Sequence, residues 1–158
     1  MFYKIVREMI KDSREAMSSL GILAASKTPS YSSFVVLIEV LDNSSSSATS
    51  KASVETALNT YSQMSYLPIL ESVIRSSTST NALLAATKRL TTSAQNAKKA
   101  WEVKQQGGTG GGSPSTVKNP YARYYSRFVE LLGRIRSTDS SVTTSAQEAL
   151  ATINQLMT

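Results

Sequence analysis

The sequence predicts an all-α protein, an up-and-down helical bundle of five to six helices, and three observations carry this prediction. Apolar residues recur at steps of three and four along most of the 158-residue chain, which is the spacing of one face of an α-helix. Each predicted helix has a single apolar face, which it has to bury against another helix. No pair of segments looks like two strands that bond to each other, and an isolated strand leaves its backbone groups unsatisfied.

The first predicted helix covers residues 2–26, and Pro29 closes it. The run 34–41, Phe34 to Leu41, is rich in β-branched residues and suits either a buried strand or a buried helix. Because no partner strand is evident, we expect it to form the most buried helix of the bundle. A polar loop over 42–47 follows it.

A further helix is predicted from about 49 to 65, with Pro68 inside the continuing apolar pattern. Proline either kinks a helix or occupies the first turn of a new one, and the sequence leaves both possibilities open. Residues 81–105 give the clearest helical pattern. Residues 1–106 are therefore assigned to helices one to four of a single bundle.

Five of the seven glycines lie in the tract 107–113, which is expected to behave as a flexible coil. We interpret this tract as an engineered linker. It indicates either a circular permutation, which predicts that Met1 and Thr158 lie close together, or the replacement of a longer loop. Residues 114–158 are assigned to the last two helices of the same bundle. One follows Pro120, and the other begins near Asp139, a residue type that often caps helices.

The chain contains no cysteine and no histidine, which excludes disulfides, thiolate nucleophiles and catalytic triads that use either residue. No motif points to another catalytic device, so the chain is not expected to be an enzyme or to hold a metal or cofactor. The carboxylates Glu8, Asp12 and Glu15 alternate with basic residues and are interpreted as surface ion pairs. No apolar run reaches the roughly 18 residues that span a bilayer, and no signal peptide is evident. A soluble protein is predicted, with the cytoplasm the favoured compartment.

The leading hypothesis for function is a structural or protein–protein interaction module that binds another protein or further copies of itself. The alternative is a nucleic-acid-binding or coat-like packaging subunit with a basic helical face, consistent with a net charge of +6 and a pI of about 9.7. Carriage of an apolar ligand is a third possibility, which needs a cavity. The candidate contact residues for a partner or nucleic acid are Lys88, Arg89, Lys98, Lys99, Trp101, Arg123, Arg127 and Arg134.

The basic residues, and a cluster of aromatic residues near Pro120, also have a purely structural explanation. The basic residues are equally explained as solvated helix faces that keep the protein in solution. The aromatic cluster Tyr121, Tyr124, Tyr125 and Phe128 suits a stacking platform for bases, a hot spot for a partner protein or core packing, and its helical spacing favours the core.

Overall fold

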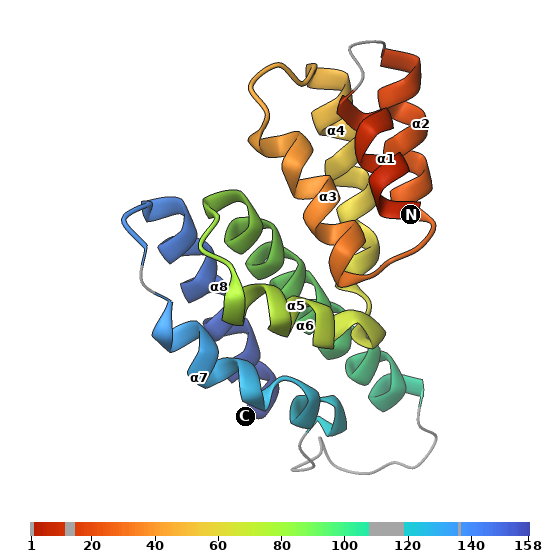
Figure 1. Ribbon diagram of the computed structural model, residues 1–158. Coiled ribbons are helices and arrows are strands. Elements are labelled where there is room, and N and C mark those ends of the chain that lie inside the picture. The colour runs from red at the N-terminus through yellow and green to blue at the C-terminus, as the bar shows by residue number, and fades with distance from the viewer. Residues whose placement is uncertain (1, 12–14, 108–118, 136) are drawn as a thin grey trace.

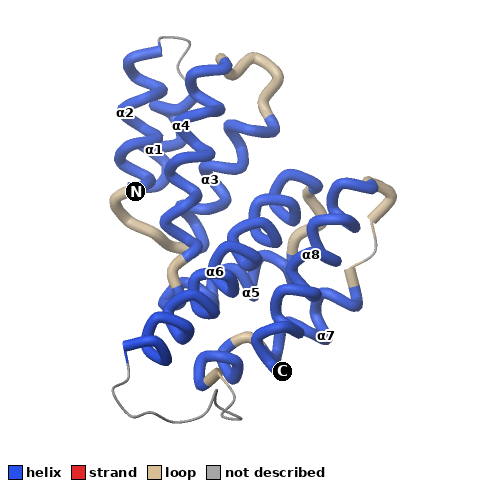
Figure 2. Tube along the Cα trace, turned by 180° about the vertical axis from the view of Figure 1, so that it is seen from behind, coloured by secondary structure: helices blue, strands red, loops and turns tan. Residues whose placement is uncertain are grey.

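The structure, a computed structural model, describes residues 2–11, 15–107, 119–135 and 137–158. Over these ranges it is all-α, without a strand, as the sequence predicted (Figures 1 and 2). The α-helices are α1 (Phe2–Lys11), α2 (Glu15–Ser26), α3 (Tyr31–Asp42), α4 (Ala48–Leu58), α5 (Leu67–Ser76), α6 (Thr80–Gly107), α7 (Ser126–Arg134) and α8 (Ser140–Met157). Three short 3-10 helices accompany them: η1 (Asn59–Ser62), η2 (Met64–Tyr66) and η3 (Pro120–Tyr124).

The predicted count of five to six helices is wrong, because the described residues form eight α-helices. One reason lies at the start of the chain, where the expected single helix over 2–26 is two helices, α1 and α2, packed side by side (Figure 1). Val6 and Ile22 are buried, one in each helix, whereas Ile5 of the predicted apolar face is 57% exposed. A single helix of that length would reach about 37 Å. Two shorter helices form instead, and both contribute to the core, through Val6 of α1 and through Ile22 and Ala25 of α2.

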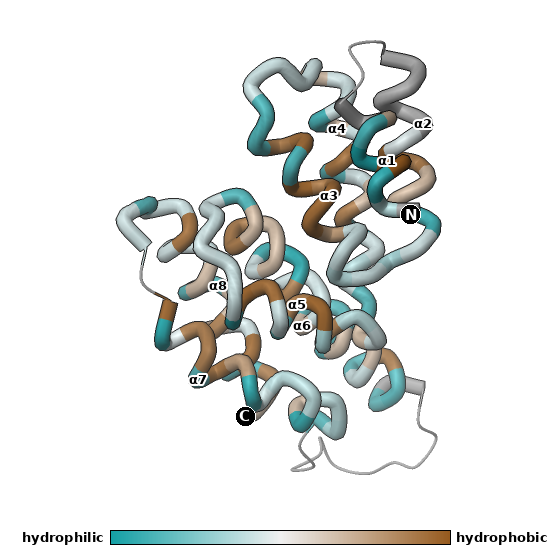
Figure 3. The backbone as a smooth tube through the Cα atoms, viewed as in Figure 1, coloured by the Kyte–Doolittle hydropathy of each residue, from teal (hydrophilic) through white to brown (hydrophobic). Residues whose placement is uncertain are grey.

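The ambiguous run 34–41 lies inside α3, so the helical interpretation is confirmed. Ser30 begins this helix by accepting a hydrogen bond from the Ser33 N–H at 3.0 Å. Phe34 and Leu37 are fully buried, as expected for a buried helix. Figure 3 shows α3 as one of the hydrophobic stretches of the chain.

The second reason for the higher count is the segment after α4, where η1 and η2 interrupt the predicted helix over 49–65. Pro68 lies in the first turn of α5, so it opens a new helix rather than kinking an old one. Its missing N–H costs nothing at that position, because the first N–H groups of a helix have no intrahelical partner.

The helices form two groups, α1–α4 and α5–α8, with most contacts inside each group (Figure 1). One hydrophobic cluster nevertheless extends through both groups. Tyr61 of η1 lies at their junction, where its ring packs edge-on against Phe34 at 5.1 Å between ring centroids. Its hydroxyl donates to the Ser30 carbonyl oxygen at 3.1 Å.

The two ends of the chain lie in different groups, with the N-terminus beside α1 and the C-terminus at the end of α8 (Figure 1). The expected closeness of Met1 and Thr158 stays a prediction, because Met1 lies outside the described residues. Gly107 ends α6. The rest of the expected linker, 108–113, lies outside the described residues.

Candidate binding groove

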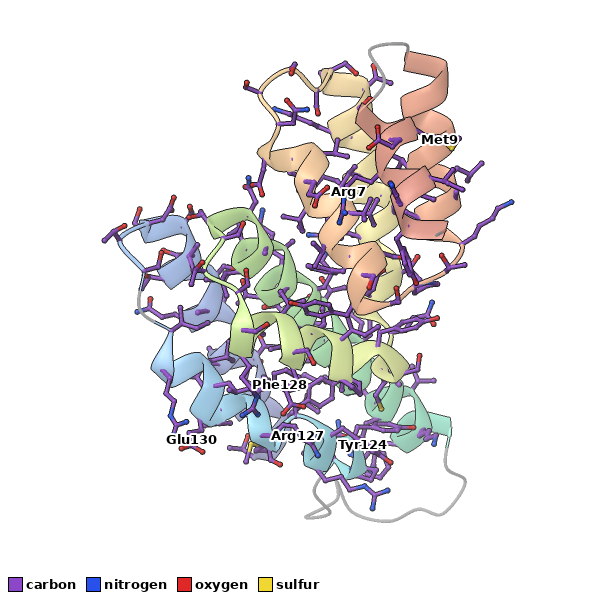
Figure 4. The ribbon with its side chains drawn as sticks, viewed as in Figure 1. Arg7, Met9, Tyr124, Arg127, Phe128 and Glu130 are labelled. Carbon is purple, nitrogen blue, oxygen red and sulfur yellow. The ribbon has the colours of Figure 1, made fainter. Side chains whose placement is uncertain are left out.

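A groove with a volume of about 230 Å³ lies between η2–α5 on one side and η3–α7 on the other. Its floor is apolar, formed by Leu67 and the fully buried Phe128. Figure 4 shows Tyr124 and Arg127 from η3 and α7 at this edge of the molecule, with Phe128 directed toward its interior. The remaining lining residues are Met64, Ser65, Pro68, Glu71 and Arg123.

The wall formed by η3 is fixed to α6 at both of its ends. At the start of η3, Asn119 accepts a hydrogen bond from the Tyr121 N–H at 2.9 Å and donates to the Ala97 carbonyl oxygen at 3.4 Å. Just after η3, the hydroxyl of buried Tyr125 lies 2.7 Å from Ser93 Oγ and donates to the Ser93 carbonyl oxygen at 3.1 Å. The exposed residues between these anchors are therefore presented from a rigid support.

Glu71 lies between two arginines on the α5 side of the groove. Its carboxylate is 2.8 Å from Arg75 Nη2 and 3.1 Å from Arg127 Nη1, and its side chain is 16% exposed. Burial alone would raise the pKa of Glu71, but the hydrogen bonds from Arg127 and Arg75 outweigh it and lower that pKa below its usual value. One carboxylate thus faces two guanidinium groups, and this side of the groove keeps a net positive charge.

Two cations lie over tyrosine rings at this end of the molecule. The Arg123 guanidinium is 4.9 Å from the ring centroid of Tyr124, which is 42% exposed. Lys104 Nζ is 5.5 Å from the ring centroid of Tyr121 and donates to its hydroxyl at 3.0 Å. Each pair presents a positive charge and a flat apolar surface together.

The structure divides the predicted contact residues instead of collecting them on one face. Arg123 and Arg127 line the groove. Lys98, Lys99 and Trp101 lie on the later turns of α6, where Lys98 Nζ is 3.5 Å from Gln155 Oε1. Their predicted cooperation with Arg123 and Arg127 stays a prediction.

The remaining predicted cations lie elsewhere. Lys88 lines a separate hollow between α6 and α8, and the exposed Arg134 pairs with Glu130. Arg89 is 5% exposed and its Nη2 binds Glu55 Oε2 at 2.7 Å, so including it in a contact surface was wrong. A buried guanidinium requires a partner inside the protein, and that partner is on α4.

The aromatic cluster divides in the same way. Tyr125 and Phe128 belong to the core, whereas Tyr121 is half-buried and Tyr124 is exposed. Burial raises the pKa of Tyr125, with the Ser93 hydrogen bond acting in the opposite direction. Met64, Pro68 and Glu71 also line the groove but were not predicted as site residues. The spacing of Glu71 and Arg75 on one helix face is a local signal for Glu71 alone.

Comparison of the chain with protein-family models, curated proteins and solved structures finds no match in any of the three. No helix among the described residues is both long and apolar enough to cross a membrane. The same residues contain no group of three or more His, Cys, Asp or Glu side chains arranged to hold a metal ion. Of the carboxylates considered in the sequence, Asp12 lies outside the described ranges.

Proposed function

We propose that the chain is a non-enzymatic protein-interaction module that binds an acidic segment of another protein in the groove between α5 and α7. One observation carries this proposal: an apolar floor at Leu67 and Phe128 lies beneath a rim with Arg123, Tyr124 and Arg127. Tyrosine and arginine are enriched among residues that dominate the binding energy of protein interfaces. The proposal includes the up-and-down order of the helices that the sequence predicted.

The expected ligand follows from the shape and charge of the groove. The cavity of about 230 Å³ accommodates one apolar side chain. Carboxylates on either side of that side chain would accept charge-assisted hydrogen bonds from Arg123 and Arg127. Such complementary charge also raises the rate of association, and it gives specificity for acidic sequences.

Single-stranded nucleic acid is the second candidate, favoured by the stacking of Arg123 on Tyr124 and of Lys104 on Tyr121. It ranks lower because Arg127 is paired with Glu71 and the other predicted cations are spread over several surfaces. Binding to further copies of the chain is a third form of the interaction role.

The test uses a fluorescent peptide with one central leucine flanked by aspartates and glutamates, measured by anisotropy. Arg123→Glu is expected to weaken binding about tenfold, since it removes one cation and adds one repulsive charge at the rim. Arg134→Glu is the matched control, because it makes the same charge change on exposed α7 surface outside the groove. It should alter affinity less than twofold.

Equal losses in both variants would contradict a specific groove and indicate attraction by net charge alone. A labelled oligo-dT titrated in parallel tests the second candidate, single-stranded nucleic acid. Tighter binding of this strand than of the peptide, with affinity falling steeply in salt, would replace the first proposal by the second. Sedimentation across protein concentrations tests self-association independently.

A further inference from the structure

A second cavity, of about 210 Å³, lies between the two helix groups. One wall is α3, with Phe34, Val35 and Ile38, and the other includes Val73 of α5 and Ala82 of α6. This inter-group cleft is separate from the α5–α7 groove and shares no lining residue with it. Its apolar walls come from helices that belong to different groups.

The charge of the inter-group cleft is opposite to that of the whole chain. Its lining includes Glu39 and Asp42 but no lysine or arginine, although the chain carries a net charge of +6. Glu39 is neutralised by Arg7, whose Nε lies 2.9 Å from Glu39 Oε2. Asp42 accepts a hydrogen bond from the neutral amide of Asn81 at 2.7 Å and has no ion pair among the described residues.

Hydroxyl groups lie at the same cleft. Tyr31 and Ser76 join the two groups through their hydroxyls at 3.2 Å. Ser77 Oγ accepts from the Ser79 N–H at 3.1 Å, and Ser79 Oγ accepts from the Ala82 N–H at 3.3 Å. The cleft therefore combines an apolar surface, one uncompensated carboxylate and hydroxyl acceptors.

We propose that the inter-group cleft binds a small organic cation, an apolar ring or short alkyl group joined to an ammonium. The cavity is slightly below the usual size of ligand pockets, so a single ring on a short chain fits it. The ring would lie between Val35 and Val73, and the ammonium would donate to Asp42. A neutral isostere gains the apolar contact but not the ion pair, and an anion is repelled.

The test is a titration of ¹⁵N-labelled protein with 2-phenylethylamine, followed by amide chemical shifts. Neutral 2-phenylethanol and anionic 3-phenylpropanoate serve as matched probes. Shifts are expected in α3 and at the α5–α6 junction, with the amine binding about fivefold more tightly than the alcohol and the anion not binding. Equal affinity for the amine and the alcohol, or shifts confined to other elements, would overturn the proposal.

Asp42→Asn is the decisive variant, because it keeps the shape of the side chain and removes its charge. It should weaken amine binding about fivefold and leave alcohol binding unchanged. Glu102→Gln, an exposed carboxylate on α6 outside the cleft lining, is the control and should change neither. A loss of amine affinity as large in Glu102→Gln as in Asp42→Asn would contradict a role for Asp42.

The same ammonium chemistry could come from a lysine side chain of a partner protein. An acetylated Lys-Phe amide distinguishes the two sources. We expect it to bind no more tightly than the free amine, and a tenfold tighter affinity would overturn the assignment to a small molecule. These probes bind away from Arg123, so this test and that of the proposed function can fail independently.

Discussion

Tyr125 shows how one buried side chain positions a functional surface. Its ring is fully buried, and its hydroxyl bonds both to Ser93 Oγ and to the Ser93 carbonyl oxygen. These bonds attach the end of η3 to α6 and so fix the neighbouring Tyr124 and Arg123 at the rim of the groove. The buried and the exposed tyrosine are adjacent in sequence but have different roles.

We expect Tyr125→Phe to lower the free energy of unfolding by about 1–2 kcal/mol, because the buried Ser93 groups lose their partner without gaining water. Tyr124→Phe is the control, since its hydroxyl is exposed and accepts a bond from Arg123. It should cost less than about 0.5 kcal/mol. Urea unfolding followed by circular dichroism measures both. Similar costs in the two variants would contradict the role given to the Tyr125 hydroxyl.

At the scale of elements, Glu71 connects α5 to α7 through Arg127. Its pKa is lowered in the folded protein, because the arginine hydrogen bonds outweigh burial. A lowered folded pKa stabilises the protein above the unfolded pKa, and this contribution disappears as the pH falls through the folded pKa. The link between the two helices is therefore pH-dependent on the acidic side.

We expect Glu71→Gln to destabilise the protein at pH 7 by roughly 0.5–1 kcal/mol, a value reduced for screening because both arginines are mostly exposed. The difference from the wild type should shrink as the pH falls below about 4.5, the ordinary value for the glutamate carboxyl. Unfolding curves at several pH values measure it. A difference that is constant with pH would show that the ion pairs contribute nothing.

The elements that the sequence predicted well are those with local signals. Asp139 caps α8 by accepting from the Ser141 N–H at 2.8 Å, and the absence of a partner strand was enough to assign α3. The division of residues 2–26 has no comparable signal, because neither proline nor glycine stands at residues 12–14. The division depends on which other helices cover each apolar face, and the local sequence does not specify this.

The candidate site was predictable only in part, for the same reason. Arg123 and Arg127 could be named from their charge, but the groove exists because α5 lies beside α7, and periodicity does not specify neighbours. Arg89 has the same helical context as Lys88, yet it is buried because α4 supplies Glu55. Burial of a charged residue depends on such tertiary partners and not on its own segment.

At the scale of the whole molecule, the two helix groups share one hydrophobic cluster but have few contacts between them. Arg89 of α6 is one of the residues that join them, through Glu55 Oε2 at 2.7 Å and the Glu55 carbonyl oxygen at 3.0 Å. Because the cluster is continuous, we expect one cooperative unfolding transition. This outcome would support the sequence-based assignment of all the helices to a single bundle.

The single tryptophan, Trp101 in α6, reports on the second group, whereas far-ultraviolet circular dichroism reports on both. In urea the two signals should share one midpoint. Glu55→Gln should lower the midpoint of both signals together and reduce the free energy of unfolding by about 1–2 kcal/mol, because the buried guanidinium loses its anion but keeps the carbonyl bond. Glu148→Gln, an exposed carboxylate on α8, should leave it unchanged. If the circular dichroism signal instead shows an early transition without a change in tryptophan fluorescence, α1–α4 unfold separately. The junction at Tyr61 and Arg89 would then be too weak to couple the two groups.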